Sequence, residues 1–460
     1  FVAAFWVLLY HYQGALATAG ILVPVLHEVL RVGRLGVDLF FALSGFILTH
    51  TYLTKMGPKV TWPASRHFWW LRLARIWPVH FVMLNVAGLA VIAQSKVSGT
   101  DASTRDWLNP VDYVKQLLLV HEWGPNPQRG WNFPAWSLSM EWLAYLLFPL
   151  LVLALFRFRD KVPTRGLVLL WCLVLVPLLW YGVAYYGDPY YISDWGSTIR
   201  ILTEFTAGGL TYLIVLRYWS ASDGVKPRVE RLATTLSVVL PLVVVGAALL
   251  LGHIGALQWT VSDLPDTPNA ADLPPKYHLV LVPVLIAWIG ALALTSRGPS
   301  RWLSTDRLVL GGFVSFSLYM THTVWYGLWR AGMSAVHIKG GVLYLISFVG
   351  LVVGAIVIAW LMWKYVEEPA REWMRRRSGE RPKPVEEIAL EADGHGADPR
   401  HATEKCSTRD RVWWNRCFRR GKICSRVAHE MTLEAWLPWA PAAWPTPNRS
   451  AASKSAASSS

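Results

Sequence analysis

Ten apolar segments dominate the sequence and restrict the fold to one class. They lie at about 1–17, 36–53, 74–94, 133–156, 166–186, 198–216, 233–252, 278–296, 310–331 and 342–363. Several approach the roughly 20 apolar residues that a helix needs to cross the hydrocarbon core of a bilayer. Inside lipid a segment must satisfy its own backbone polar groups, so such segments span as α-helices. The sequence therefore predicts an all-α, polytopic membrane protein with about ten transmembrane helices.

The composition favours the same class of protein. Of the 460 residues, 53% are hydrophobic and only 16% are charged, and the 27 tryptophans are typical of aromatic belts at membrane interfaces. The net charge of +14 is spread over loops and the C-terminal tail rather than gathered on one soluble face, which argues against nucleic acid as a partner. The four cysteines form no C-x-x-C pair, so we predict neither a metal site nor a redox pair.

Basic residues concentrate in alternate loops. The loops on one side of the predicted bundle contain Lys55, Lys59, Arg66, Arg72, Arg75, Arg157, Arg159, Lys161, Arg165, Arg217, Lys226, Arg228, Arg231, Arg297, Arg301 and Arg307. The two long loops on the other side, 95–132 and 253–277, are poorer in basic residues. The positive-inside rule places the basic loops in the cytoplasm. An even number of spans then puts both termini in the cytoplasm of a multi-pass plasma-membrane protein.

The first apolar segment and the C-terminal region both differ from a regular transmembrane span. The chain starts without Met inside the first apolar segment, which is short for a full span, so we expect a truncated N-terminus. Pro369 follows two glutamates and is expected to end the last helix. We therefore predict a transmembrane domain over 1–370. Residues 371–460 comprise a basic juxtamembrane segment and a Pro-, Ala- and Ser-rich tail that we expect to be disordered.

Glu141 occupies the position at which an ionisable side chain costs the most free energy to place in a membrane. It lies in the segment 131–142, shortly after the start of the fourth apolar segment. A carboxylate near a helix centre in the membrane costs about 2.5–3.5 kcal/mol, so it marks a functional candidate if it faces protein or a water-filled cavity. A structural polar contact with a neighbouring helix is the alternative. Ser137 and Ser139 in the same segment are further candidates.

His11 is the second candidate, in the first apolar segment. A single His on an apolar helix is more often a hydrogen-bonded core residue than a catalyst. The predicted topology, however, puts both His11 and Glu141 in the outer halves of their spans. A general base oriented by a carboxylate would have this arrangement.

Arg72 and Arg75 are one helical turn apart, at the predicted cytoplasmic end of the third span. Charge anchoring at the membrane surface is the simpler interpretation. The alternative is a fork for phosphates, because guanidinium groups bind phosphate in a bidentate manner and keep their charge. A phosphorylated cytosolic donor such as coenzyme A would need such a site.

Further polar residues stand out in apolar segments. Asp38 at the start of the second span is expected to cap its helix. Ser44 in the same span is a candidate nucleophile, but no base is adjacent to it in sequence. A hydrogen bond from its hydroxyl to the backbone of its own helix is therefore favoured over a catalytic role. His322 lies in the middle of the ninth span, which Ser317, Tyr319 and Thr321 make unusually polar. We expect this helix to line an internal cavity, because a polar face would be costly against lipid.

Five segments resemble, in order, the signature segments of the acyltransferase 3 family of membrane proteins. They are Gly36–Phe46, the Arg72 and Arg75 pair, Trp136–Trp142, Ser317–His322 and Glu367–Pro369. The resemblance covers about residues 1–370. It implies ten transmembrane helices and transfer of an acyl group, commonly acetyl, from cytosolic acyl-coenzyme A (acyl-CoA). The implied acceptor is a hydroxyl of a surface or exported carbohydrate or glycolipid, and no permanently bound cofactor is implied.

The resemblance also implies roles for individual residues. His11 matches the catalytic histidine of the first helix, Arg72 and Arg75 match the arginine pair on the donor side, and Glu141 matches the carboxylate of the fourth helix. The family's Arg-rich lead-in before the histidine is absent here, as expected for a truncated N-terminus. Some members carry an outer esterase-like domain. We expect this chain to act alone or with a separate extracytoplasmic transferase partner.

Two other functions remain open at the level of sequence. A proton-coupled transporter or flippase of a sugar or lipid-linked sugar would use Glu141 and His322 for proton coupling and would not need Arg72. A scaffold acting through its tail would depend on 380–460. The basic pair favours the acyltransferase. Within that hypothesis, direct transfer and an acyl-His11 intermediate both remain possible.

Overall fold

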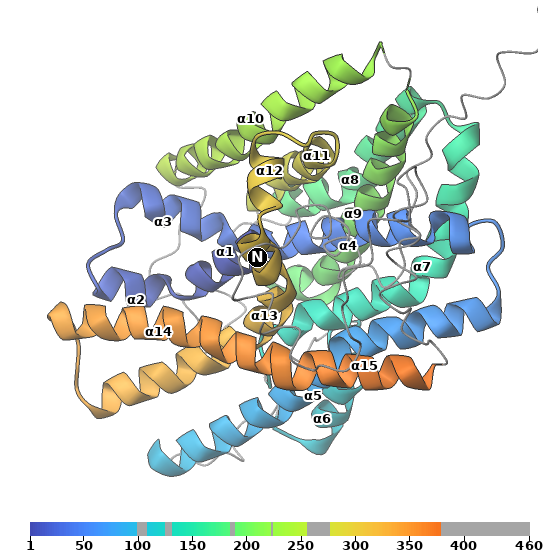
Figure 1. The fold of residues 1–460 in the computed structure, drawn as a ribbon. Coiled ribbons are helices and arrows are strands. Elements are labelled where there is room, and N and C mark those ends of the chain that lie inside the picture. The colour runs from blue at the N-terminus through green and yellow to red at the C-terminus, as the bar shows by residue number, and fades with distance from the viewer. Residues whose placement is uncertain (99–107, 125–130, 185–188, 222–223, 255–276, 379–460) are drawn as a thin grey trace, which may run out of the picture. The chain divides into compact units, whose positions relative to one another are not determined.

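The computed structural model describes residues 1–98, 108–124, 131–184, 189–221, 224–254 and 277–378, which all belong to one compact unit, Phe1–Ser378 (Figure 1). The predicted disorder of 380–460 and three of the four cysteines lie outside the described residues.

The described residues form helices and no strands, so the all-α prediction is confirmed. The α-helices are α1 (Val2–His11), α2 (Gln13–Thr18), α3 (Pro24–Arg31), α4 (Leu35–Met56), α5 (Trp62–Ser98), α6 (Pro110–Leu117), α7 (Ala135–Lys161), α8 (Thr164–Ala184), α9 (Pro189–Trp219), α10 (Lys226–His253), α11 (Val282–Ala293), α12 (Pro299–Leu303), α13 (Asp306–Ala335), α14 (Gly341–Met362) and α15 (Glu368–Arg377). Within this part of the chain, eight helices are long and apolar enough to cross a membrane, and two shorter apolar helices, Val2–His11 and Leu279–Ala293, complete the ten predicted segments.

Helix α4 runs through the middle of the bundle and contacts α1, α7, α9 and α11 (Figure 1). Its closest neighbour is α9, and glycines allow the approach. A Cβ atom at Gly45 would lie 1.9 Å from the carbonyl oxygen of Phe205, and one at Gly208 would lie 2.0 Å from that of Ala42. Small residues at such a crossing let two backbones pack directly against each other, which holds membrane helices together. The apolar residues that remain exposed on α8, α10 and α14 provide the surface for lipid.

We expect Gly45→Ala to destabilise the bundle, because the added methyl can fit only if two backbones move apart. Overpacking of this kind costs about 1–3 kcal/mol. Gly246→Ala in α10 is the matched control, since nothing lies within 4 Å of its added Cβ. Thermal unfolding of purified protein in detergent would measure both variants. Equal unfolding temperatures would show that the close approach of α4 and α9 does not limit stability.

The first predicted span is interrupted directly after His11. Tyr12 leaves helical geometry, with φ −95° and ψ 7°, and α2 starts at the following residue. The Tyr12 side chain is fully buried, and its hydroxyl donates to the backbone oxygen of His322 in α13 at 3.0 Å. This contact fixes the C-terminal end of α1, and therefore His11, against the middle of α13.

The prediction that Pro369 ends the last helix is wrong. Figure 1 shows α15 continuing from α14. A π-helical turn over Trp363–Glu367 joins the two helices, and Pro369 lies in the first turn of α15. Pro is tolerated there because the first N–H groups of a helix have no intrahelical partner to lose. The π turn also has functional interest, since such turns often occur at functional sites. Here it directs Glu367 into the bundle, where the side chain is 1% exposed.

Candidate active site

His11 and His322 meet at the end of α1. The Nε2 atom of His322 lies 2.9 Å from the Nδ1 atom of His11, and the ring centroids are 4.9 Å apart. His322 is buried, and His11 is half-buried with the ring of Phe133 edge-on at 6.0 Å. The sequence analysis identified both residues separately but did not predict that they are partners.

Backbone carbonyls set the hydrogen positions in this pair. The Nδ1 atom of His322 lies 2.7 Å from the Tyr319 oxygen and 3.2 Å from the Leu318 oxygen. A carbonyl can only accept, so this nitrogen carries the hydrogen and the Nε2 of a neutral His322 is an acceptor. His11 Nδ1, which also lies 3.0 Å from the Val7 oxygen, is then the donor. The Nε2 atom of His11 is left with a lone pair, as a general base requires.

Glu141 lies inside the bundle but is not the partner of His11. One of its oxygens accepts hydrogen bonds from Ser44 at 3.1 Å and from the hydroxyl of Tyr145. Arg75 and Arg72 act electrostatically on the same carboxylate. The prediction that Glu141 orients His11 is therefore wrong for this structure. The sequence predicted how deep Glu141 lies in its span, but it did not predict which side of α7 the residue occupies.

Ser44 also differs from expectation. Its hydroxyl donates to Glu141 across 97 positions of sequence instead of to its own helix, and it lies 3.5 Å from the hydroxyl of Tyr145. Because the two residues belong to α4 and α7, no local sequence pattern reveals this contact. Ser44 and Tyr145 together hold the Glu141 carboxylate in place.

Arg72 and Arg75 lie within α5 and not at its start. Helix α5 begins at Trp62, so Arg72 is ten residues, or about 15 Å, along the helix. Arg75 forms an ion pair with Glu367, whose second oxygen accepts from Ser317 at 2.7 Å. The two arginines therefore do not form a symmetrical fork.

Arg72 is the more available of the two cations. Its guanidinium lies 6.0 Å from the ring centroid of Tyr52 and 5.9 Å from that of Phe68. Arg72 is only 7% exposed, and its Nε has no hydrogen-bond partner among the described residues. A buried guanidinium with an unused donor is a suitable contact for an anion.

The two serines of the fourth-span segment have different contacts. The Ser137 hydroxyl lies 2.8 Å from that of Tyr319, and the Tyr319 hydroxyl donates to the Pro134 oxygen at 3.1 Å. Ser139 instead donates to the Leu119 oxygen at 2.8 Å, on another side of α7. Ser137 and Tyr319 thus lie beside the histidine pair, whereas Ser139 anchors the segment around residue 119.

Asp38 does not cap its helix. It makes no capping hydrogen bond and forms an ion pair with Arg200 of α9, with an Nη2–Oδ1 distance of 2.8 Å. Arg200 also acts electrostatically on Glu204, which is completely buried. The sequence analysis missed both α9 residues. Their charges lie within the apolar segment 198–216, so the criterion that identified Glu141 would have found them.

We group these polar residues as a column. Arg72 and Arg75 act electrostatically on Glu141, Arg75 pairs with Glu367, Glu367 accepts from Ser317, and Ser317 belongs to the same helix as His322. Along α13, Ser317 and His322 are five residues, or about 7.5 Å, apart. Ser317, Tyr319 and His322 are all buried, so these polar side chains lie against protein and not lipid.

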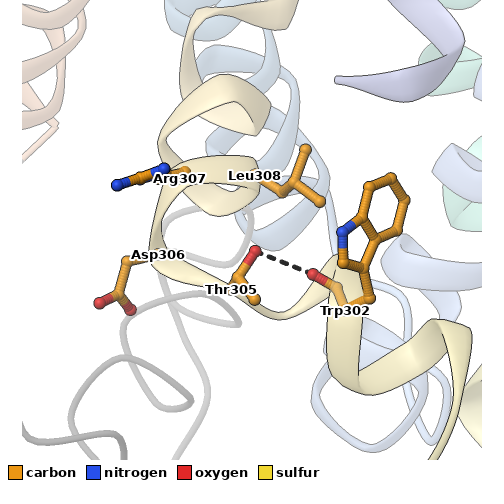
Figure 2. A pocket seen from close by; sticks show the side chains of 5 residues that line it. All are labelled: Trp302, Thr305, Asp306, Arg307 and Leu308. Atoms are coloured by element: carbon orange, nitrogen blue, oxygen red, sulfur yellow. Dashed lines mark hydrogen bonds between the residues drawn. The ribbon is translucent and has the colours of Figure 1, made fainter.

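A surface hollow of about 570 Å³ lies elsewhere. Figure 2 shows its lining residues at the junction of α12 and α13: Trp302, Thr305, Asp306, Arg307 and Leu308. Asp306 starts α13, sixteen residues or about 24 Å along the helix from His322. None of the predicted site residues contributes to this hollow, so we do not place the chemistry there.

Comparisons with known proteins agree with the geometry. A family model described as an acyltransferase domain matches residues 1–364. Acyltransferase MdmB of Streptomyces mycarofaciens is 28% identical over 310 residues, which cover 64% of this chain and 68% of that protein. A candidate peptidoglycan O-acetyltransferase of Bacillus subtilis, YrhL, is 26% identical over 184 residues, or 35% of this chain and 26% of that protein. No solved structure matches the chain significantly.

A candidate O-acetyltransferase of Staphylococcus aureus is 30% identical over 146 residues, or 31% of this chain and 24% of that protein. The chain therefore spans about a quarter of the length of the Bacillus and Staphylococcus relatives, but about two thirds of MdmB.

Proposed function

Because the chain belongs to the acyltransferase 3 family of membrane proteins, we propose that it transfers an acyl group, with acetyl as the first choice, from cytosolic acyl-CoA to a hydroxyl of an extracytoplasmic or lipid-linked carbohydrate. Membership of this family shows that the protein is a membrane-embedded acyltransferase. What we propose is the identity of the acyl donor and of the acceptor. The observation that carries them is the polar column, which leads from a buried guanidinium to a histidine with a lone pair.

The donor class is supported by Arg72. Acyl-CoA combines phosphates, which guanidinium groups bind, with a long flexible arm that carries the thioester. We place a phosphate of the donor near Arg72 and extend the arm along the column towards His11. The basic loops near this end of the column lie on the cytoplasmic side in our topology, with both termini, which agrees with a cytosolic donor.

The acceptor class is supported by the relatives. Those of Bacillus and Staphylococcus are named as O-acetyltransferases, and the Bacillus protein is named for peptidoglycan. A hydroxyl of a carbohydrate outside the cytoplasm, presented directly or by a separate transferase partner, fits the outer position that our topology predicts for His11. The chemistry needs a neutral alcohol oxygen to become nucleophilic, which is the task of a base.

The reaction then proceeds at the Nε2 atom of His11. This atom takes the proton of the acceptor hydroxyl while the hydroxyl oxygen forms a bond to the thioester carbonyl carbon. The C–S bond breaks, and the leaving thiolate takes the proton back from His11, so the enzyme returns to its starting state. Glu141, held by Ser44 and Tyr145, contributes by balancing the charge of Arg72.

The test uses the complete chain in lipid nanodiscs with radiolabelled acetyl-CoA and no added acceptor, so that water replaces the acceptor. We expect slow release of free CoA. Arg72→Ala should weaken donor binding about 10- to 100-fold, the contribution of a hydrogen bond to a charged group. Arg297→Ala, at a side chain that is 71% exposed, is the control and should match the wild type.

Two results would overturn the proposal. Folded wild-type protein that neither binds nor hydrolyses acetyl-CoA would exclude the donor. Unchanged donor use in Arg72→Ala, with transport of a sugar detected instead, would favour the transporter. Arg72→Lys is a second variant in case Arg72→Ala does not fold, because Lys keeps the charge but loses the planar fork of donors.

A further inference from the structure

Among the described residues, no carboxylate contacts His11. Its ring lies against the rings of Tyr10, Phe133 and His322, and its Nδ1 contacts the Val7 oxygen and His322. Arg34 also acts on it electrostatically. Bases of this kind are usually held by a third group that fixes the ring and its tautomer. In this chain the only described side chain in position to do so is His322.

We propose that His322 is the positioning residue of the reaction: as a neutral imidazole it accepts the Nδ1 hydrogen of His11 and so directs the basic Nε2 of His11 at the acceptor hydroxyl. This inference rests on the proposed function. It replaces the carboxylate that sequence reasoning assigned to the role.

The orientation of His322 is determined by its own contacts. Its Nδ1–H is held by the Tyr319 and Leu318 oxygens, so its Nε2 has to be the acceptor. Its backbone oxygen accepts from the buried hydroxyl of Tyr12, which directly follows His11 in the chain. The same short segment therefore contributes both the base and a contact that holds α13 against it. The ring of His322 can neither rotate nor change tautomer without losing these bonds.

A neutral partner suits this position inside a membrane protein. A carboxylate beside His11 would bury an ion in the resting enzyme, at a cost that an uncharged imidazole avoids. During the reaction the proton taken up at His11 Nε2 creates a positive charge. The Nδ1–H bond to His322 strengthens as that charge develops, because hydrogen bonds from ionised donors are stronger. The thiolate then removes the added proton, and both rings return to their neutral state.

The experiment compares four variants by CoA release in nanodiscs: His322→Ala, His322→Gln, His11→Ala and the double variant His11→Ala with His322→Ala. Gln can place a side-chain oxygen near the site of Nε2 and still accept a hydrogen bond. His80→Gln is the matched control. His80 is equally buried and its Nε2 lies 2.7 Å from a backbone oxygen, that of Gln116, but none of its described contacts is with the column.

We expect His322→Ala to lower the rate about 10²-fold, within the range that a correctly held base contributes. His322→Gln should recover most of the loss, and donor affinity should not change. The double variant should be no slower than His11→Ala, because a residue that acts only through His11 has nothing left to position. His80→Gln should match the wild type.

Two results would refute the positioning role. One is His322→Ala at the wild-type rate. The other is a double variant whose loss equals the product of the two single losses, which indicates a general structural effect. Both leave the proposed function intact, provided that the wild type releases CoA in a manner that depends on His11. If the wild type itself releases none, the proposed function fails first.

Discussion

His11→Ala should reduce the rate of CoA release about 10²- to 10⁴-fold while leaving acetyl-CoA binding close to that of the wild type. This is the range that a positioned general base contributes. The loss is expected in the rate and not in donor affinity, because the proposed donor contact, Arg72, is on another part of the column. The measurement is single-turnover release of CoA from protein that has been matched by size-exclusion elution and amount.

Chemical rescue with a small free base would test directly whether the missing group is a base. His11→Gly leaves space at the end of α1, and free imidazole should restore part of the lost rate if only the base is missing. Imidazole should not accelerate Arg72→Ala, whose defect is in binding. A His11→Ala protein with the wild-type rate would show that another group takes the proton, and the acceptor would then have to be placed elsewhere in the bundle.

The sequence predicted the helices well because apolar length is a local property. The ten segments correspond in order to the ten helices, and the main error was the start of the third span, placed at 74 although α5 begins at Trp62. The error has a physical cause. Arg66 and Arg72 lower the hydropathy of this stretch, yet Arg72 is buried against aromatic rings, so a charged residue extends a span that hydropathy would end.

The candidate site was predicted as separate residues but not as pairs. Ionisable residues inside apolar segments are costly, and this criterion, together with the predicted depth of His11, identified His11, Glu141 and His322. The partners could not be predicted, because the depth of a residue follows from its place in a span, whereas the direction it faces depends on how the helices pack. His11 and His322 are 311 positions apart, and Arg75 and Glu367 are 292 apart.

The same criterion points to Arg200, where we expect the largest effect on stability. Arg200 holds the buried Asp38 in an ion pair, lies 4.9 Å from the ring centroid of Trp136 and acts on the buried Glu204. Arg200→Ala removes the only described cation in contact with these carboxylates. Breaking a buried ion pair by removing one partner costs about 3–5 kcal/mol, because the remaining charge stays buried without compensation.

Arg200→Ala should therefore unfold well below the wild type in detergent and accumulate poorly in membranes. Neutralising the carboxylates should reverse much of this loss, so Arg200→Gln combined with Asp38→Asn and Glu204→Gln should be more stable than Arg200→Ala. The physical reason is that an uncharged amide costs far less to bury than an ion. If Arg200→Ala instead unfolded like the wild type, Asp38 and Glu204 would have to be solvated or protonated, and the ion pair would not be needed to hold α4 against α9.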